Sequence, residues 1–250
     1  MDHTVRSLSF LGFERVIMKR ITAVFLSILC ILMLICPAVS AEESDLPLPP
    51  EEQEDEIVAE IYICTKFVIV GHVWIYVENK RKPVIAEDGT VIDDGAITVG
   101  CYKCPVGQGV SVGTDLLTRA NGAGIYYNVE AYKLQNKKNK SVIYTHIPLT
   151  SEELDILNKR ILKSNQWTPF TNCGLFATQA WNSVSDRHIA YGVFPFVTAL
   201  SIISKRTDDE KNTAIKFKPV SKENVFKQKG RKDKAVLKPC NDLSLVMWVG

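Results

Sequence analysis

The sequence predicts an α+β protein in which an antiparallel sheet comes first in the chain and helices follow it. Between Ile57 and Ile147, short runs of aliphatic and aromatic residues are separated by Asp-Gly turns, a pattern typical of strands. From Thr150 onward, apolar residues recur at the three- and four-residue spacing of helices. A chain of 250 residues with 46% hydrophobic side chains can build one or at most two domains with a real core.

The N-terminal segment has the features of an export signal. An apolar run over 21–39 follows Lys19-Arg20, and small residues precede a predicted cleavage after Ala41. We therefore expect residues 1–41 to be a signal peptide, with Met18 as the true start. An uncleaved membrane anchor is the alternative, because the run approaches the length that spans a bilayer. Both predictions place the rest of the chain outside the cell, as a secreted or cell-wall associated protein.

The exported part begins with an acidic, proline-bearing stretch over 42–60, which predicts a flexible leader. The whole chain has a formal charge of +2, but without its first 41 residues it carries 26 basic and 26 acidic side chains. A neutral chain gives no reason to expect a nucleic acid as partner. Membrane contact is expected only through an uncleaved signal segment.

The first strand is predicted to run from Ile57 to Val77. Its second half alternates, with aliphatic residues such as Val73 and Ile75 on one side and His72 and Trp74 on the other. Further strand signals follow at 110–114, 124–132 and 141–147, and together they indicate an antiparallel meander. The second of these signals places four polar or aromatic residues on one face: Tyr126, Asn128, Glu130 and Tyr132.

Three helices are predicted after the strands. A capping box, Thr150-Ser-Glu-Glu153, opens the first, which ends near Ser164. The second is a buried helix that begins at Cys173 and is capped by Thr171 or Asn172, and the third runs from Pro195 to about Lys205. The lysine-rich stretch 211–238, within a C-terminal extension over 206–250, predicts a solvated, irregular surface segment.

The exported chain keeps five cysteines: Cys64, Cys101, Cys104, Cys173 and Cys240. If Cys173 is a free thiol, the other four can form two disulfides in any of three pairings, or none. The Cys101-Tyr-Lys-Cys104 spacing is that of half a zinc site, but no second pair or His cluster completes it, so a strand or hairpin with incidental thiols is the better interpretation. No metal or cofactor is predicted.

Cys173 and His72 are the candidate catalytic residues. The first turn of a helix lowers a thiol pKa, because its unpaired N–H groups stabilise the thiolate. A thiolate also needs an imidazole beside it that holds the proton, and His72 lies on the less aliphatic side of its strand. Each residue also has a structural interpretation, since a buried Cys packs as a small hydrophobe and a strand His is often only a hydrogen-bonded core residue.

Two segments resemble a known family. Gly71-His72-Val-Trp-Ile-Tyr-Val77 followed by Asn172-Cys173-Gly-Leu-Phe-Ala177 is similar to the circularly permuted branch of the papain-like NlpC/P60 superfamily, which includes lecithin:retinol acyltransferase-like proteins. Segments 112–114 and 124–130 and the long Cys173 helix also resemble secreted Firmicutes proteins of that type. The similarity covers roughly 65–205, which predicts a domain over 61–205.

The resemblance implies a permuted papain-like fold, in which an antiparallel sheet packs against the Cys-bearing helix. Cys173 would attack an amide, ester or thioester carbonyl, His72 would accept and return the proton, and Asn128 or Glu130 would orient the imidazole. The implied activity is that of a peptidase or amidase, with peptides or peptidoglycan as substrates. The alternatives are an acyltransferase or esterase acting on an acyl-bearing lipid, and a secreted binding module without chemistry.

Overall fold

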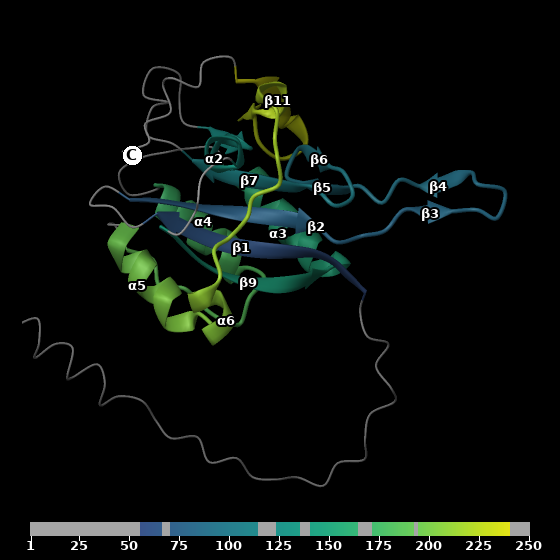
Figure 1. Ribbon diagram of the computed structural model, residues 1–250. Coiled ribbons are helices and arrows are strands. Elements are labelled where there is room, and N and C mark those ends of the chain that lie inside the picture. Colours follow the sequence, from purple (N-terminus) through teal and green to yellow (C-terminus); the bar gives the residue numbers. More distant parts are fainter. Residues whose placement is uncertain are drawn as a thin grey trace, which may run out of the picture. The chain divides into compact units, whose positions relative to one another are not determined.

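The computed structural model describes residues 56–66, 71–114, 124–135, 141–164, 172–192 and 195–240 (Figure 1). Their main element is a seven-stranded sheet in the order β11-β10-β8-β7-β2-β1-β9, in which every pair of neighbours is antiparallel. Its strands are β1 (Ile57–Lys66), β2 (His72–Asn79), β7 (Gly109–Thr114), β8 (Ile125–Tyr127), β9 (Val142–Thr150), β10 (Phe226–Lys229) and β11 (Val236–Pro239). The predicted α+β class with a large antiparallel sheet is confirmed.

The remaining elements are short helices and two small hairpins. The helices are α2 (Val129–Leu134), α3 (Ser151–Lys163), α4 (Cys173–Asn182), α5 (Pro195–Lys205) and α6 (Asp208–Asn212), with the 3-10 turns η2 (Lys222–Asn224) and η3 (Lys232–Lys234). The hairpins pair β3 (Val84–Ile85) with β4 (Val91–Asp93), and β5 (Ile97–Val99) with β6 (Tyr102–Cys104).

Both faces of the sheet are covered, so the molecule has two cores. On one face, residues of α3, α4 and α5 pack against β1, β2 and β7. On the other face, α2 and buried residues between α6 and β10 cover Trp74 and Tyr76 of β2. In Figure 1, α4 lies behind the sheet and the segment after α6 crosses in front of it. β2 is therefore buried on both sides, which fixes the position of its first residue, His72.

The prediction of one strand from Ile57 to Val77 is wrong. The structure has two strands, which pair antiparallel so that Lys66 lies opposite His72 and Ile63 opposite Ile75. The connection over 67–70, including Phe67 and Ile69, lies outside the described residues. The apolar run is continuous in sequence because both strands are central and buried, and this continuity concealed the turn between them.

The strand predicted over 124–132 is also shorter than expected. β8 ends at Tyr127, and Asn128 adopts a left-handed conformation with φ 67° before α2 begins. The expected shared face of Tyr126, Asn128 and Glu130 is therefore wrong. Asn tolerates this conformation better than most residues, because its short side chain can hydrogen-bond locally.

The predicted helices are confirmed. Thr150 caps α3 through a complete capping box with Glu153, and α5 has the predicted bounds of Pro195 and Lys205. The lysine-rich stretch is not irregular, however, because it contributes the strands β10 and β11 to the main sheet. Lysines suit this position, because charged side chains protect sheet edges from pairing with other chains.

The predicted signal peptide over 1–41 and most of the leader, residues 42–55, lie outside the described residues. β1 begins at Ile57, so the folded part starts within the stretch predicted as leader. Within the described ranges, no helix has both the length and the apolar character needed to span a bilayer. No disulfide joins the five cysteines of the described residues, Cys64, Cys101, Cys104, Cys173 and Cys240.

Candidate active site

Cys173 is the first residue of α4, and Asn172 caps this helix. The Asn172 side chain accepts a 3.2 Å hydrogen bond from the Leu175 amide, whereas Thr171, the other predicted cap, lies outside the described residues. Since the cap occupies the Leu175 amide, the N–H groups nearest the sulfur remain available. The thiol is 9% exposed, so it lies at the border between core and surface.

Packing of α4 on β2 brings the thiol to the beginning of that strand. The backbone amides of Val73 and Gly174 both hydrogen-bond the Cys173 sulfur, and the His72 imidazole does so as well. Strand β2 and helix α4 thus supply three donors to one sulfur atom. Such an arrangement favours the charged thiolate over the neutral thiol.

His72 lies between Cys173 and a carboxylate. Its Nε2 is 2.9 Å from Glu130 Oε1, and its ring stacks on Trp74 with the centroids 5.6 Å apart. Because Nε2 faces Glu130, Nδ1 is the ring nitrogen left to exchange a proton with the sulfur. The His72 side chain is 19% exposed, so a substrate can approach this side of the pair.

Glu130 is itself held in place. Its Oε2 accepts a 2.8 Å hydrogen bond from Ser111 Oγ, which in turn accepts a 3.1 Å bond from the Ala131 amide. The carboxylate also fills the space beside Gly113, where an added Cβ would lie 2.4 Å from Glu130 Oε1. A glycine in a strand interior often marks such a close approach.

Asn128 does not contribute to the site. Its side-chain amide donates to the Asn224 carbonyl at 2.9 Å and its backbone amide to the Ser111 carbonyl at 2.7 Å. These bonds fix the turn between β8 and α2, and the side-chain amide holds this turn to the segment that precedes β10. Of the two residues predicted to orient the imidazole, the structure brings only Glu130 to it.

The two partners shift each other's pKa in opposite directions. Burial alone lowers the pKa of His72, but the Cys173 sulfur and the Glu130 carboxylate raise it to about 10. Burial alone raises the pKa of Cys173, but the imidazolium and the two backbone amides lower it below its ordinary value. Both shifts favour a thiolate and imidazolium pair at neutral pH.

The sequence did not identify Ser111 or Gly113 as parts of the site. Ser111 gave no signal, because a Ser within a strand has no distinctive pattern. Gly113 carried a weak one, since glycine is unfavourable inside a strand unless something lies close to the backbone. Within the described part of the chain, no three His, Cys, Asp or Glu side chains are placed to hold a metal ion.

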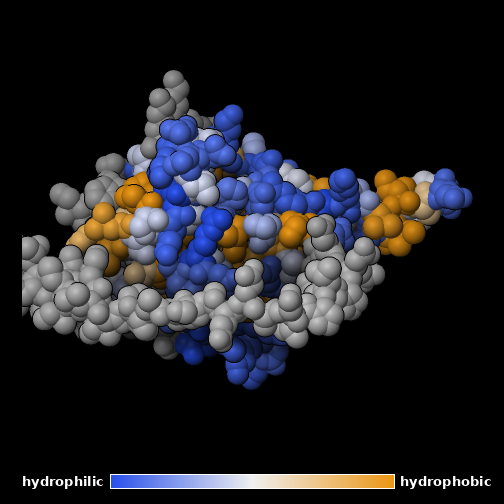
Figure 2. Space-filling model, turned by 90° about the horizontal axis from the view of Figure 1, so that it is seen from below, coloured by the Kyte–Doolittle hydropathy of each residue, from blue (hydrophilic) through white to orange (hydrophobic). Residues whose placement is uncertain are grey.

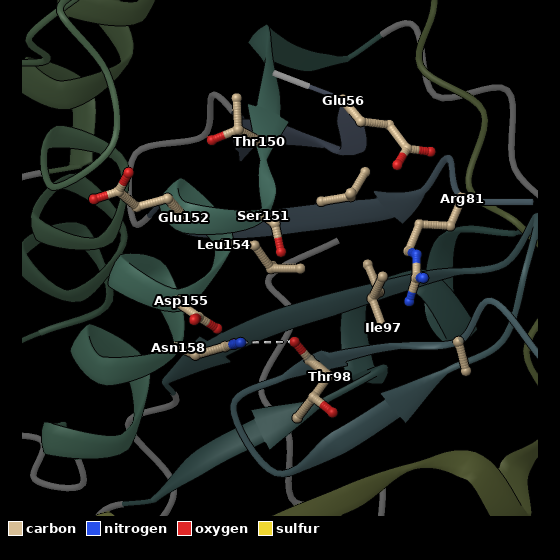
Figure 3. Close-up of a pocket in the computed structure, with 12 residues that line it drawn as sticks. Glu56, Arg81, Ile97, Thr98, Thr150, Ser151, Glu152, Leu154, Asp155 and Asn158 are labelled. Atoms are coloured by element: carbon tan, nitrogen blue, oxygen red, sulfur yellow. Dashed lines mark hydrogen bonds between the residues drawn. The ribbon is translucent and has the colours of Figure 1, made fainter. Parts of the chain in front are cut away.

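A pocket of about 530 Å³ lies elsewhere, between the start of β1 and the first turn of α3 (Figure 3). Its walls are mostly polar and include Glu56, Arg81, Glu152 and Asp155. It is at the opposite end of β1 from His72, roughly 25 Å along the strand. This pocket is therefore separate from the Cys173 site.

No protein-family model matches the chain, and neither the curated proteins nor the solved structures gave a match. The geometry of the Cys173 site is therefore the main basis for a proposed function.

Proposed function

We propose that this chain is an exported cysteine hydrolase with a permuted papain-like fold, in which Cys173, His72 and Glu130 act as nucleophile, acid–base and orienting group. The observation that carries the proposal is the position of His72, which contacts the Cys173 sulfur on one side and Glu130 on the other. The order of these residues in the chain, His first and Cys last, agrees with the permuted branch that the sequence resembles.

The geometry supports acyl transfer through a thioester. The Cys173 thiolate attacks a carbonyl carbon, and the imidazolium of His72 gives its proton to the leaving amine or alkoxide. Water, deprotonated by the now neutral His72, then releases the acyl group and restores the thiolate. The Cys173 amide has no acceptor among the described residues, and at the start of α4 it is suited to stabilise the oxyanion.

Glu130 keeps the imidazole oriented throughout this cycle. Its carboxylate stabilises the positive charge on His72, and its own bond to Ser111 fixes the carboxylate plane. An amide of a peptide is the preferred substrate class in this proposal, with peptidoglycan peptides as the natural target of an exported protein.

A specific observation also supports the acyl-lipid alternative. Helix α5 exposes Phe196, Leu200 and Ile203, which are 49%, 56% and 39% exposed and share one side of the helix. The opposite side of α5 faces the Cys173 helix, because Thr198 Oγ1 lies 3.6 Å from the position a Cβ would take at Gly174. The exposed apolar side of α5 therefore lies next to the site, although not within it, and offers an acyl chain a surface near Cys173.

Alkylation by iodoacetamide across pH tests whether the pair exists. We expect Cys173 to react at pH values well below those of an ordinary thiol, and His72→Ala to remove this reactivity. His188→Ala is the matched control, since His188 is exposed and lies in a loop. Equal reactivity of Cys173 in wild type and His72→Ala would refute the proposed pair.

Mass spectrometry of the acylated protein separates the candidate substrates. Peptide amides and thioesters should leave a transient acyl group on Cys173 if the protein is a peptidase, and long-chain lipid esters should do so if it is an acyltransferase. Cys173→Ala must abolish the adduct in either case. A reactive Cys173 that no substrate acylates would favour the binding module.

A further inference from the structure

The hairpin of β3 and β4 projects from the body of the molecule (Figure 1). Its aliphatic side chains are exposed. Figure 2 shows the hydrophobic colour gathered on this projection. The exposed fractions are 48% for Val84, 57% for Ile85, 57% for Val91 and 70% for Ile92. We call residues 82–95 the arm.

The arm is apolar on more than one side. Ile85 lies opposite Val91 on the neighbouring strand, so these two share a face. Val84 lies opposite Asp93, and the register shift between the two pairs leaves Ile92 as the extra residue of a bulge. An isolated two-stranded ribbon is only marginally stable in water, and aliphatic side chains that stay exposed do not stabilise it. Contact with another surface therefore explains these four residues better than the folding of the arm does.

The charges of the arm are separated along its length. At its base, Asp93 pairs with Arg81 at 2.5 Å and Asp94 with Lys103 at 2.6 Å. Among the described charges of the arm, Lys82 at the base and Glu87 and Asp88 at the tip make no ion pair, and all three are exposed. The arm therefore has an unpaired positive charge at its base and two unpaired negative charges at its tip.

We propose that the arm binds the arm of a second copy of this chain, with the two arms antiparallel and their Ile85 and Val91 faces in contact. A two-fold axis between Val84 and Ile85 places Lys82 of each copy beside Glu87 of the other, so two ion pairs form at once. One symmetric arrangement thus covers the face of Ile85 and Val91 and pairs Lys82 with Glu87 in both copies.

The faces of the arms, rather than their edges, make this contact. Pro83 stands just before β3 and has no N–H to donate, so it opposes pairing along the edge of β3, the strand through which the two-fold axis passes. Insertion into a membrane is the less favourable use, because Glu87 and Asp88 at the tip would have to enter it first.

Two short arms bury much less surface than a stable dimer requires. The association should thus be weak and visible only at high concentration. Sedimentation equilibrium of the purified protein measures it directly. We expect a monomer–dimer equilibrium that Ile85→Ser with Val91→Ser shifts to monomer, whereas Val236→Ser, on a similarly exposed residue of β11, leaves it unchanged.

Charge exchange identifies a second copy as the partner. Lys82→Glu or Glu87→Lys alone should raise the dimer Kd about tenfold, because each places like charges together twice, and the double exchange should restore it. A wild-type protein that stays monomeric up to about 0.5 mM overturns the proposal. So does a double exchange that fails to restore the dimer, or an arm-dependent binding to anionic phospholipid vesicles by a monomer.

Discussion

Ser111 Oγ donates a 2.8 Å hydrogen bond to Glu130 Oε2, so the residue that orients His72 is itself oriented from strand β7. Together with the contact between Glu130 and His72, this bond connects three elements, since Ser111 lies on β7, Glu130 on α2 and His72 on β2. The proposed catalytic group is thus the end of a buried chain of hydrogen bonds, and each bond can be tested separately.

Removing the hydrogen bond between Ser111 and Glu130 should make the Cys173 thiolate less stable relative to the neutral thiol. Ser111→Ala leaves Glu130 without its hydroxyl donor, and we expect the apparent pKa of the Cys173 thiol to rise by roughly one unit. The pH profile of alkylation measures this shift. Ser183→Ala is the control, because that hydroxyl bonds only to the Ala180 carbonyl at the end of α4. Coincident profiles for Ser111→Ala and wild type would show that Ser111 has no positioning role.

Gly113→Ala should displace the Glu130 carboxylate while the fold is kept. The new methyl group would lie 2.4 Å from Glu130 Oε1, so the carboxylate must move away from His72. We expect a roughly tenfold or greater loss of turnover, because a small misplacement of an orienting group is costly. Circular dichroism would show whether the variant is folded. A folded Gly113→Ala variant with full turnover would exclude Glu130 from the mechanism.

Turnover should fall both at low pH, the acid limb of the profile, and at high pH, the alkaline limb. On the acid side, turnover should fall as Cys173 gains a proton, at a pH below the ordinary thiol value of 9.0 because its pKa is lowered. On the alkaline side it should fall near pH 10, where His72 loses its proton. Alkylation of Cys173 should show the acid limb only, since a thiolate stays nucleophilic when His72 is neutral. A thiol that titrates with ordinary values in both assays would contradict the pair.

Glu210 should make stability depend on pH. Its buried carboxylate accepts hydrogen bonds from the amides of His146 at 2.8 Å and Thr207 at 2.6 Å. Burial raises the pKa of Glu210, but these bonds hold it below its ordinary 4.5. A lowered pKa in the folded state stabilises the protein above pH 4.5, and this contribution is lost as the pH falls through the folded-state value.

Urea unfolding of Glu210→Gln tests this dependence. We expect a loss of roughly 2 kcal/mol at pH 7 relative to wild type, and a smaller difference at pH values below about 4. Glu152→Gln is the control, because Glu152 is exposed in the first turn of α3 and should leave the unfolding midpoint unchanged. A difference that does not change with pH would mean that packing, not charge, is lost.

Local signals predicted the helices well. The Thr150 and Glu153 capping box and the Asn172 cap depend on contacts within one turn, which the sequence contains directly. The pairing of Cys173 with His72 was also proposed from residue types, and the structure places them in contact.

Contacts across the sheet were harder to predict. Glu130 could not be separated from Asn128 by alternation, because the left-handed Asn128 ends the strand and turns Glu130 onto a helix. The strands β10 and β11 were missed because lysines on a sheet edge look like a solvated segment when the sheet is unknown. Ser111 has meaning only through its partners on α2, which lie 19 and 20 residues away in sequence.

The distance along the chain between His72 and Cys173 has a consequence for biogenesis. About a hundred residues must be synthesised and ordered before helix α4 can dock on β2, and until then the thiol has neither the imidazole nor the amide of Val73 beside it. An unfolded polypeptide would therefore carry a thiol of ordinary, low reactivity. Reactivity is acquired only when the tertiary structure closes, so the protein would stay chemically unreactive until it has folded.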